Sequence, residues 1–334
     1  MYVLATGTCL PGPAVDNSAL AARFGMNAEW IELFVGTRTR HFGVDLDSGE
    51  RTHSIVDLGS HAARQALDRA GLEPSDVDFL VLATATPDTL MPTSATGIAD
   101  RLGMNLIPAY QLQSGCSGAI SALDVGRRML DDDHRVGLVI GADLCAKHMV
   151  LDRDVGSMPP SKLVNYMLFG DGAGAMVIAA DAQGAVMRID SVHCVFDGLD
   201  SVPGQIIEWF GDADRASEAA AVQEDYKAIE RRVPGLSVET AGDLLRRSSW
   251  SAEDIDYLLP PQLSGIMTAR IRKEMGMDGA HEISCVAETG NSGNALAFLQ
   301  FDHLAGVIET GNRALAVAIE SSRWIRGGIT LEGM

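Results

Sequence analysis

The sequence has few of the features that mark membrane, secreted or metal-stabilised proteins. No apolar run approaches the roughly 18 residues that a membrane-spanning helix needs. The start, Met1–Ala5, has no basic residue before its apolar stretch, so no signal peptide is expected. The five cysteines are scattered, and no two of them form a Cys-x-x-Cys pair. We therefore expect no disulfide framework, no metal site, no membrane association and a cytoplasmic location.

Basic residues are also scarce. Lys and Arg total 26 against 45 Asp and Glu, which gives a formal net charge of −19. Nucleic-acid binding draws its affinity from the neutralisation of phosphates, so this charge argues against a nucleic-acid partner. The rest of the composition, 46% hydrophobic and 21% charged over 334 residues, is typical of a globular protein with a sizeable core.

Short apolar runs alternate with segments of helical spacing along the first half of the chain. The patterns predict strands at 2–7, 79–83, 108–113 and 136–141, and helices at 56–70, 94–102 and 119–130. Strands that alternate with helices of this length indicate βαβ units and a mainly parallel sheet. The sequence therefore predicts an α/β fold.

Three short segments recur in the same order in the second half. Residues 76–80 recur at 254–258, 115–118 at 290–293, and 135–139 at 313–317, with offsets of 178, 175 and 178 residues. We infer a duplication, with one unit over 1–180 and a second over 181–334. The second unit carries an insertion at about 197–231, with a helix expected at 216–231, and we expect this insertion to cap a pocket.

The duplication places Cys116 and Asn291 at equivalent strand-to-helix turns. Two such turns would meet across a pseudo-twofold axis, each at the N-terminus of a helix. A helix N-terminus favours the thiolate, and its free amides can hold a developing oxyanion. The Asn291 amide can donate to a thioester carbonyl or an enolate. The pattern favours acyl chemistry with Cys116 as nucleophile; the alternative is a cysteine that packs as a small buried hydrophobe.

Several short motifs along the chain, including these two turns, match the pattern of one known family. They are Trp30-Ile31, Gly36–His41, Leu82–Thr84, Pro92–Ala95, Ser114–Ala119, Phe169–Ala175 and Gly290–Ser292. Together they resemble the thiolase superfamily and, within it, the β-ketoacyl-acyl-carrier-protein synthase III group. The resemblance covers nearly the whole chain, and Phe169–Ala175 (Phe-Gly-Asp-Gly-Ala-Gly-Ala) is its most specific part. It implies the five-layered αβαβα thiolase fold and a homodimer.

The resemblance also implies ping-pong acyl transfer without a tightly bound cofactor. In this family a cysteine takes an acyl group from a coenzyme A or phosphopantetheine (acyl-carrier protein) thioester, and a small-molecule or carrier-bound acceptor then attacks. Cys116 matches the nucleophile. Asn291 matches the asparagine that, together with a histidine, holds the malonyl carbonyl oxygen during decarboxylation.

Other positions are assigned to substrate binding by the same resemblance. Trp30 matches a residue that stacks on the coenzyme A adenine, and Met91 matches one that reaches the neighbouring subunit's acyl pocket. Arg323 and Trp324 stand in a C-terminal loop that in the family is rich in glycine and supplies an oxyanion-hole amide. We expect these two side chains to reshape the cavity.

The family's histidine is missing from this chain. The family pattern is Val-Pro-His-Gln, whereas this sequence has Leu259–Gln262 with Pro261 in the place of the histidine. Proline has neither a side-chain donor nor a base, and the loss of one acid/base group costs about 10² to 10⁴ in rate. We therefore expect weak decarboxylation. His148 and Glu288 are the candidate substitute bases.

The retained Cys116 and Asn291, together with the missing histidine, predict a thioester-dependent acyltransferase. The enzyme would form acyl-Cys116 and pass the acyl group to an oxygen, nitrogen or thiol acceptor in specialised metabolism. Two alternatives stay open. One is a decarboxylating condensing enzyme whose histidine is replaced from elsewhere, and the other is a non-condensing partner subunit of a heteromeric ketosynthase.

Overall fold

The computed structural model describes residues 1–149, 151, 158, 160–208 and 222–334. Ten strands hydrogen-bond in the order β12-β11-β13-β14-β8-β1-β7-β6-β4-β5. Their bounds are β1 (Tyr2–Cys9), β4 (Phe79–Ala83), β5 (Ala109–Leu112), β6 (Val136–Leu144), β7 (Asp171–Ala179), β8 (Met187–Phe196), β11 (Tyr257–Leu259), β12 (His281–Glu282), β13 (Arg313–Glu320) and β14 (Ile325–Gly333). The order β1-β7-β6-β4-β5 is mirrored by β8-β14-β13-β11-β12, and β1 and β8 pair at the centre.

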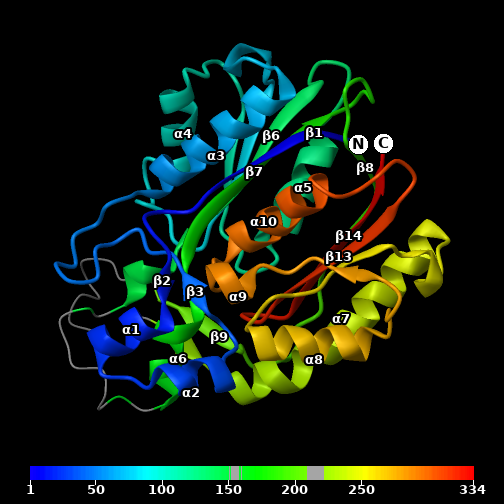
Figure 1. Ribbon diagram of the computed structural model, residues 1–334. Helices are drawn as coiled ribbons and strands as arrows, with labels where there is room; N and C mark the ends of the chain where they lie inside the picture. The colour runs from blue at the N-terminus through cyan, green and yellow to red at the C-terminus, as the bar shows by residue number, and fades with distance from the viewer. Residues whose placement is uncertain (150, 152–157, 159, 209–221) are drawn as a thin grey trace.

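Helices cover the outer face of each of the two mirrored strand sets, and further helices lie between the sets (Figure 1). Helices α3 (Ile55–Ala70) and α4 (Ser94–Leu102) cover the first set, and α7 (Tyr226–Ser248) and α8 (Gly265–Met275) cover the second. Helices α5 (Gly118–Met129) and α10 (Asn294–Ala305) lie between them and contact strands of the first set, and α5 also contacts β8 and β14. These layers are the αβαβα arrangement that the sequence resemblance predicted.

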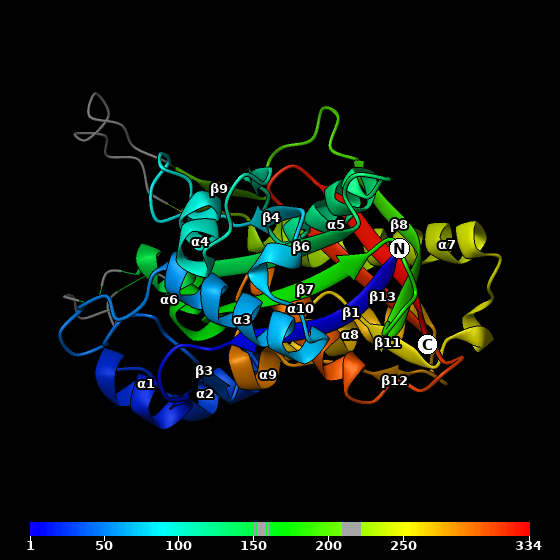
Figure 2. The same cartoon turned by 90° about the horizontal axis from the view of Figure 1, so that it is seen from above.

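The remaining elements lie around this core. They are β2 (Val15–Asp16), α1 (Asn17–Phe24), α2 (Ala28–Phe34), β3 (Thr39–Arg40), α6 (Pro160–Leu168), β9 (Gln205–Ile207), β10 (Val222–Glu224) and α9 (Val286–Thr289). Figure 2 shows α1 and α2 at the end of the molecule away from α7. Among the described residues, no helix combines the length and the apolar character that crossing a bilayer requires.

Local sequence explains where the central elements begin and end. Helix α3 starts at a capping box between Ser54 and Asp57 and ends at Gly71, which has a left-handed φ of 67°. Strand β4 is buried along its whole length, as expected for a strand with parallel neighbours on both sides. Phe298 and Phe301 of α10 are fully buried, so the space between the sheets is a packed core.

The helix predicted at 216–231 is confirmed over Tyr226–Arg231 but wrong at Val222–Glu224, and residues 216–221 lie outside the described residues. Val222–Glu224 forms β10, which pairs antiparallel with β9 and sets Val222 opposite Ile207. Helix α7 starts only at Tyr226, because the Asp225 side chain caps it by accepting from the Ala228 N–H (3.0 Å). Cross-strand pairing of two β-branched residues therefore overrides helical spacing here.

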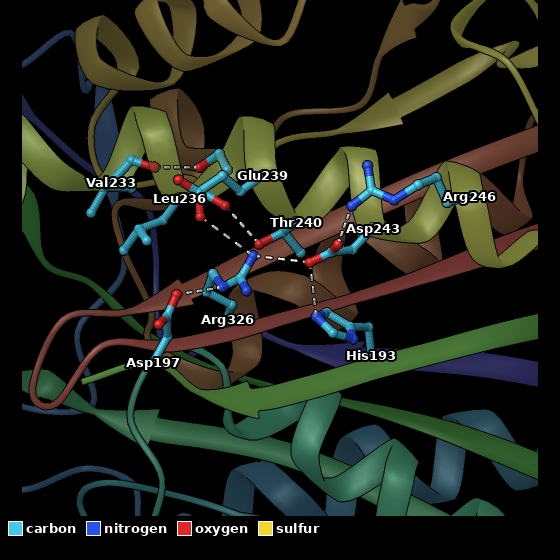
Figure 3. Close-up of polar contacts among 10 residues, drawn as sticks. His193, Asp197, Val233, Leu236, Glu239, Thr240, Asp243, Arg246 and Arg326 are labelled. Carbon is cyan, nitrogen blue, oxygen red and sulfur yellow. Dashed lines mark hydrogen bonds and ion pairs between the residues drawn. The ribbon is translucent and has the colours of Figure 1, made fainter. Parts of the chain in front are cut away.

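A cluster of charged side chains joins α7 to the sheet (Figure 3). Arg326 of β14 lies 3.0 Å from Asp243 of α7 and 2.9 Å from Asp197. Asp243 also lies 3.5 Å from the Nε2 of His193 on β8. Arg326 and His193 are largely buried, so this cluster fastens the outer helix to two adjacent strands.

Candidate active site

A cavity of about 360 Å³ opens beside the turn that carries Cys116. Strand β5 ends at Leu112, and the chain turns through Gly115 and Cys116 into α5. The Gly118 N–H donates to the Gly115 carbonyl (2.7 Å) and closes this turn. The cavity wall is mostly apolar, with Cys116 and Asn291 both on it. Its size and its few polar groups are typical of a small-molecule site.

Asn291 reaches the cavity from the second half of the chain. Its N–H donates to the Leu168 carbonyl (2.8 Å), and its own carbonyl accepts from the Gly170 N–H (3.1 Å). Three residues further on, the Asn294 side chain donates to the Ser114 carbonyl (3.0 Å). Hydrogen bonds therefore join the segment around Asn291 to the first half of the chain, including the turn that carries Cys116. Cys116 and Asn291 lie on the same cavity.

The side chains that pack against the turn around Cys116 explain why two of its residues are glycines. A Cβ on Gly118 would lie 2.1 Å from the Oδ1 of Asn294. A Cβ on Gly115 would lie 1.9 Å from the Oε2 of Glu320. Both distances are far shorter than a van der Waals contact, so side chains from the second half of the chain occupy the space that these glycines leave.

The Cys116 thiol is held in its neutral form. Burial raises the pKa of Cys116 well above its usual value, and the negative charges of Glu320, Asp143 and Glu224 raise it further. The side chain is half-buried, and its remaining exposure is to the cavity. This direction is the opposite of the lowered pKa that a helix N-terminus alone would give.

Asp143 is a buried acid that links the two halves. Its Oδ1 accepts from the backbone N–H of Ala85 (2.7 Å) and from the hydroxyls of Thr84 and Thr86. Its Oδ2 accepts from the backbone and side-chain nitrogens of Asn294 (2.7 and 2.8 Å). Both oxygens are therefore saturated, and Asp143 holds the start of α10 against the first sheet. Burial raises its pKa in spite of these bonds.

Polar residues of the insertion line the cavity near Glu224. The Glu224 carboxylate accepts from Gln205 Nε2 (2.7 Å) and from the Tyr226 hydroxyl (2.5 Å), and that hydroxyl also contacts Asn165. Burial and the Glu224 charge raise the pKa of Tyr226, so its hydroxyl stays protonated. The described part of the insertion thus forms one wall of the cavity.

Pro261 lies on the cavity wall beside Gln262. The Oε1 of Gln262 accepts from the hydroxyl of Ser284 and from the N–H groups of Cys285 and Val286. The Asn291 side chain donates weakly to the Leu263 carbonyl (3.4 Å). The wall therefore carries an amide donor at Asn291 and an apolar ring at Pro261.

The two candidate bases lie in different places. His148 lines the cavity, and burial together with the nearby Lys147 lowers its pKa, so its imidazole is neutral at pH 7. Glu288 lies outside the described cavity lining, where it forms an exposed ion pair with Arg38. Geometry thus favours His148 as the group that can meet a bound substrate.

The four candidate substrate-binding residues lie outside the described lining. Trp30 is partly exposed and stacks on Phe34, with ring centroids 4.9 Å apart, and Met91 is 85% exposed. Arg323 is exposed. Trp324 is buried, and its indole donates to the Val202 carbonyl (2.9 Å). Trp324 therefore packs in the interior and is absent from the described cavity lining, contrary to the expectation that it would reshape the cavity.

Sequence reasoning missed three groups at this site: Asp143, Cys145 and Glu320. Cys145 lines the cavity, and burial raises its pKa well above the usual value. Asp143 and Glu320 each stand near the carboxyl end of a mostly apolar strand, β6 or β13, and the sequence repeats relate these two strands. An acid at the end of a buried strand was the available signal.

Among the described residues, no group of three or more His, Cys, Asp or Glu could hold a metal ion.

Comparisons with known proteins agree with this geometry. Residues 110–198 match the family model of 3-oxoacyl-[acyl-carrier-protein (ACP)] synthase III. Over 327 residues the chain is 31% identical to beta-ketoacyl-[acyl-carrier-protein] synthase III 3 of Streptomyces coelicolor, covering 93% of this chain and 91% of that one. The structure is similar to AbyA1, a tetronic acid condensing enzyme, with a TM-score of 0.96, 50% identity and 99% of each chain covered. It is also similar to 3-oxoacyl-(acyl carrier protein) synthase III of Pseudomonas aeruginosa PAO1, with a TM-score of 0.82, 27% identity and coverage of 99% and 98%.

Proposed function

This chain belongs to the 3-oxoacyl-[acyl-carrier-protein] synthase III family, and from that premise we propose that it joins two acyl thioesters through acyl-Cys116 without decarboxylation, as the closure of a tetronic acid ring requires. The observation that carries the proposal is a cavity that keeps the nucleophile and Asn291 while Pro261 takes the place of the decarboxylating histidine. The likeness to AbyA1 supports the choice of ring.

Tetronic acid is a five-membered enol lactone, and its atoms divide into two acyl units. One unit is a 2-hydroxyacyl group, which we place on Cys116. The other is a β-ketoacyl thioester, whose α-carbon attacks the acyl-Cys116 carbonyl and expels the Cys116 sulfur. The 2-hydroxyl then attacks the β-ketoacyl thioester carbonyl and expels its thiol. One carbon–carbon and one carbon–oxygen bond form, two thiols leave, and no carbon dioxide is released.

This acceptor suits a site without the family histidine. The α-carbon of a β-ketoacyl thioester lies between two carbonyls, so a modest base removes its proton. Neutral His148 on the cavity wall is our candidate for that base, and Asn291 for the donor to the enolate oxygen. Decarboxylation makes a heavier demand on the enolate donors, which Pro261 cannot meet.

The charge of the cavity also disfavours a malonyl group. Glu320, Asp143 and Glu224 all act on Cys116, and no Lys or Arg belongs to the described lining. A malonyl carboxylate would enter a low-dielectric site next to like charges, which is unfavourable. An uncharged β-ketoacyl group avoids this cost.

The donor and acceptor thioesters would be carried by coenzyme A or by the phosphopantetheine arm of a carrier protein. A homodimer and the absence of a tightly bound cofactor belong to the same proposal. The sequence analysis expected acyl-Cys116 to be passed to an oxygen, nitrogen or thiol acceptor. The present proposal replaces that acceptor with a carbon nucleophile, as the likeness to AbyA1, a condensing enzyme, suggests.

The first test is acylation of Cys116. We expect lactoyl-coenzyme A, a simple 2-hydroxyacyl thioester, to add one lactoyl mass to the peptide that carries Cys116. Cys116→Ala should show no shift. Cys145→Ala should keep it, and this variant is the matched control because Cys145 is a second half-buried thiol on the same cavity. A shift that survives in Cys116→Ala, or that resides on the Cys145 peptide, would overturn the assignment of the nucleophile.

A further inference from the structure

Glu320 is a buried acid whose second carboxylate oxygen is unused. It ends strand β13 and is 1% exposed. Its Oε1 accepts from the Ser322 N–H (2.7 Å), but no described atom hydrogen-bonds to its Oε2. A buried carboxylate oxygen without a donor is costly and uncommon. The arrangement therefore calls for a function rather than a packing explanation.

The unused oxygen lies against the nucleophile turn. A Cβ placed on Gly115 would meet the Oε2, Cδ and Oε1 of Glu320 at 1.9, 2.4 and 2.7 Å. Gly115 directly precedes Cys116, and the Cys116 N–H lies near enough to lower the Glu320 pKa, although it makes no hydrogen bond of good geometry. The carboxylate is thus packed against the backbone that carries the thiol.

Asp143, Glu224 and Glu320, the three acids that raise the pKa of Cys116, differ in how many hydrogen bonds their carboxylate oxygens accept. Both oxygens of Asp143 are saturated by Thr84, Ala85, Thr86 and Asn294. Each oxygen of Glu224 already accepts one hydrogen bond. Glu320 alone among the three keeps an oxygen without a donor, and its charge acts on Cys116 more strongly than the other two.

A neutral thiol needs a base before it can attack a thioester. Cys116 is held neutral, the histidine position carries Pro261, and the described cavity lining has no Lys or Arg to stabilise a thiolate. We propose that Glu320 is the general base for Cys116. As the sulfur attacks the donor carbonyl, its proton passes to Glu320 Oε2. Glu320 is itself absent from the described lining, but it stands between Ile319 and Ser321, which belong to it. As the donor carbon–sulfur bond breaks, Glu320 returns that proton to the leaving thiol.

The step balances without any other reagent. One sulfur–carbon bond forms at Cys116, one breaks in the donor, and the proton moves from Cys116 through Glu320 to the departing thiol. Burial raises the pKa of Glu320 above that of an ordinary carboxyl group, which brings it closer to that of its proton donor. This inference rests on the proposed acylation of Cys116, and it adds the group that makes the acylation feasible.

The experiment compares Glu320→Gln with wild type in two assays. Glutamine keeps the oxygen that accepts from Ser322 and loses the charge and the base. First, the pH dependence of Cys116 alkylation by iodoacetamide, resolved by peptide, should move to lower pH in Glu320→Gln, because a negative charge beside the thiol has gone. Second, acylation by lactoyl-coenzyme A should fall by about 10²-fold or more. Glu320→Asp should recover part of that rate.

Slower acylation together with alkylation that moves to lower pH distinguishes a loss of catalysis from damage to the fold. A misfolded variant would lose both reactions, and Glu253→Gln, the same change at an exposed site, should alter neither. The inference is overturned if wild-type Cys116 is acylated and Glu320→Gln is acylated at the same rate, or if the alkylation profile does not move. If wild-type Cys116 takes no acyl group, the proposed function fails, while the alkylation profile still reports whether Glu320 acts on the thiol.

Discussion

Gly115 and Glu320 share one small space beside Cys116. Gly115 does not have a positive φ, so alanine would fit its backbone. The added methyl group would nevertheless lie 1.9 Å from the Glu320 carboxylate. We expect Gly115→Ala to lower the free energy of unfolding by about 1–3 kcal/mol, the usual cost of overpacking. Urea denaturation measures this change.

Two comparisons identify the collision as the cause. In a Glu320→Ala background the cost of Gly115→Ala should largely disappear, because the colliding atoms are gone. Gly235 lies inside α7 with no atom within 4 Å of an added Cβ. Gly235→Ala should therefore raise stability by about 0.5–1 kcal/mol. An equal cost of Gly115→Ala with and without Glu320 would contradict this account of the turn.

The sequence alone could locate some of these residues and not others. Cys116 and Asn291 could be predicted to meet because the repeats relate their turns, and Pro261 stood out against a family pattern. Glu320 could not be singled out, since its meaning depends on which side chain faces Gly115 after folding. The same holds for the pKa of Cys116, because a helix N-terminus is local whereas burial and the distant acids are not.

At the scale of elements, α7 is attached to the sheet through Arg326 (Figure 3). Its guanidinium lies 3.0 Å from Asp243 and 3.6 Å from Glu239, both on α7, and 2.9 Å from Asp197. Replacing it by methionine keeps much of the apolar stem and leaves Asp243 without a largely buried arginine partner. We expect Arg326→Met to destabilise the protein by about 1–3 kcal/mol, measured by urea denaturation.

A matched substitution shows whether burial matters. Arg128 forms an exposed ion pair with Asp124 within helix α5, and such pairs contribute about 0–1 kcal/mol. Arg128→Met should therefore have the smaller effect. Equal effects of the two substitutions would mean that Arg326 does not fasten α7 to the sheet.

Element boundaries followed the sequence where local signals agree with the fold. Strand β4 and helix α4 have the bounds that were predicted, because buried apolar runs and capping residues define them. The stretch that forms β10 was predicted to be helical, since its pairing with β9 is a contact that helical spacing does not reveal. Helix α7 also continues through Pro234, which sequence rules alone would treat as a break.

At the scale of the whole molecule, the mirrored strand order explains why the site is composite. Strands β6 and β13 hold corresponding places in the two sets, and each ends near a buried acid, Asp143 or Glu320. Helices α5 and α10 start beside these acids, and the turns that precede them bring Cys116 and Asn291 to the cavity. The division of the chain into two units at about residue 180 stays a prediction. The sequence repeats do not predict the acceptor, because its recognition depends on the side chains that line the cavity at Pro261 and around Glu224.

The most direct measurement of the central claim is a chase of preformed lactoyl-Cys116. After removal of free donor, the acyl-enzyme is mixed with either acetoacetyl-coenzyme A or malonyl-coenzyme A, and the acyl mass on Cys116 and the carbon dioxide released are followed together. We predict that acetoacetyl-coenzyme A discharges the acyl group and yields 3-acetyl-5-methyltetronic acid without carbon dioxide. Malonyl-coenzyme A should leave lactoyl-Cys116 intact. Discharge by malonyl-coenzyme A with one carbon dioxide per acyl group, and none by acetoacetyl-coenzyme A, would contradict the account.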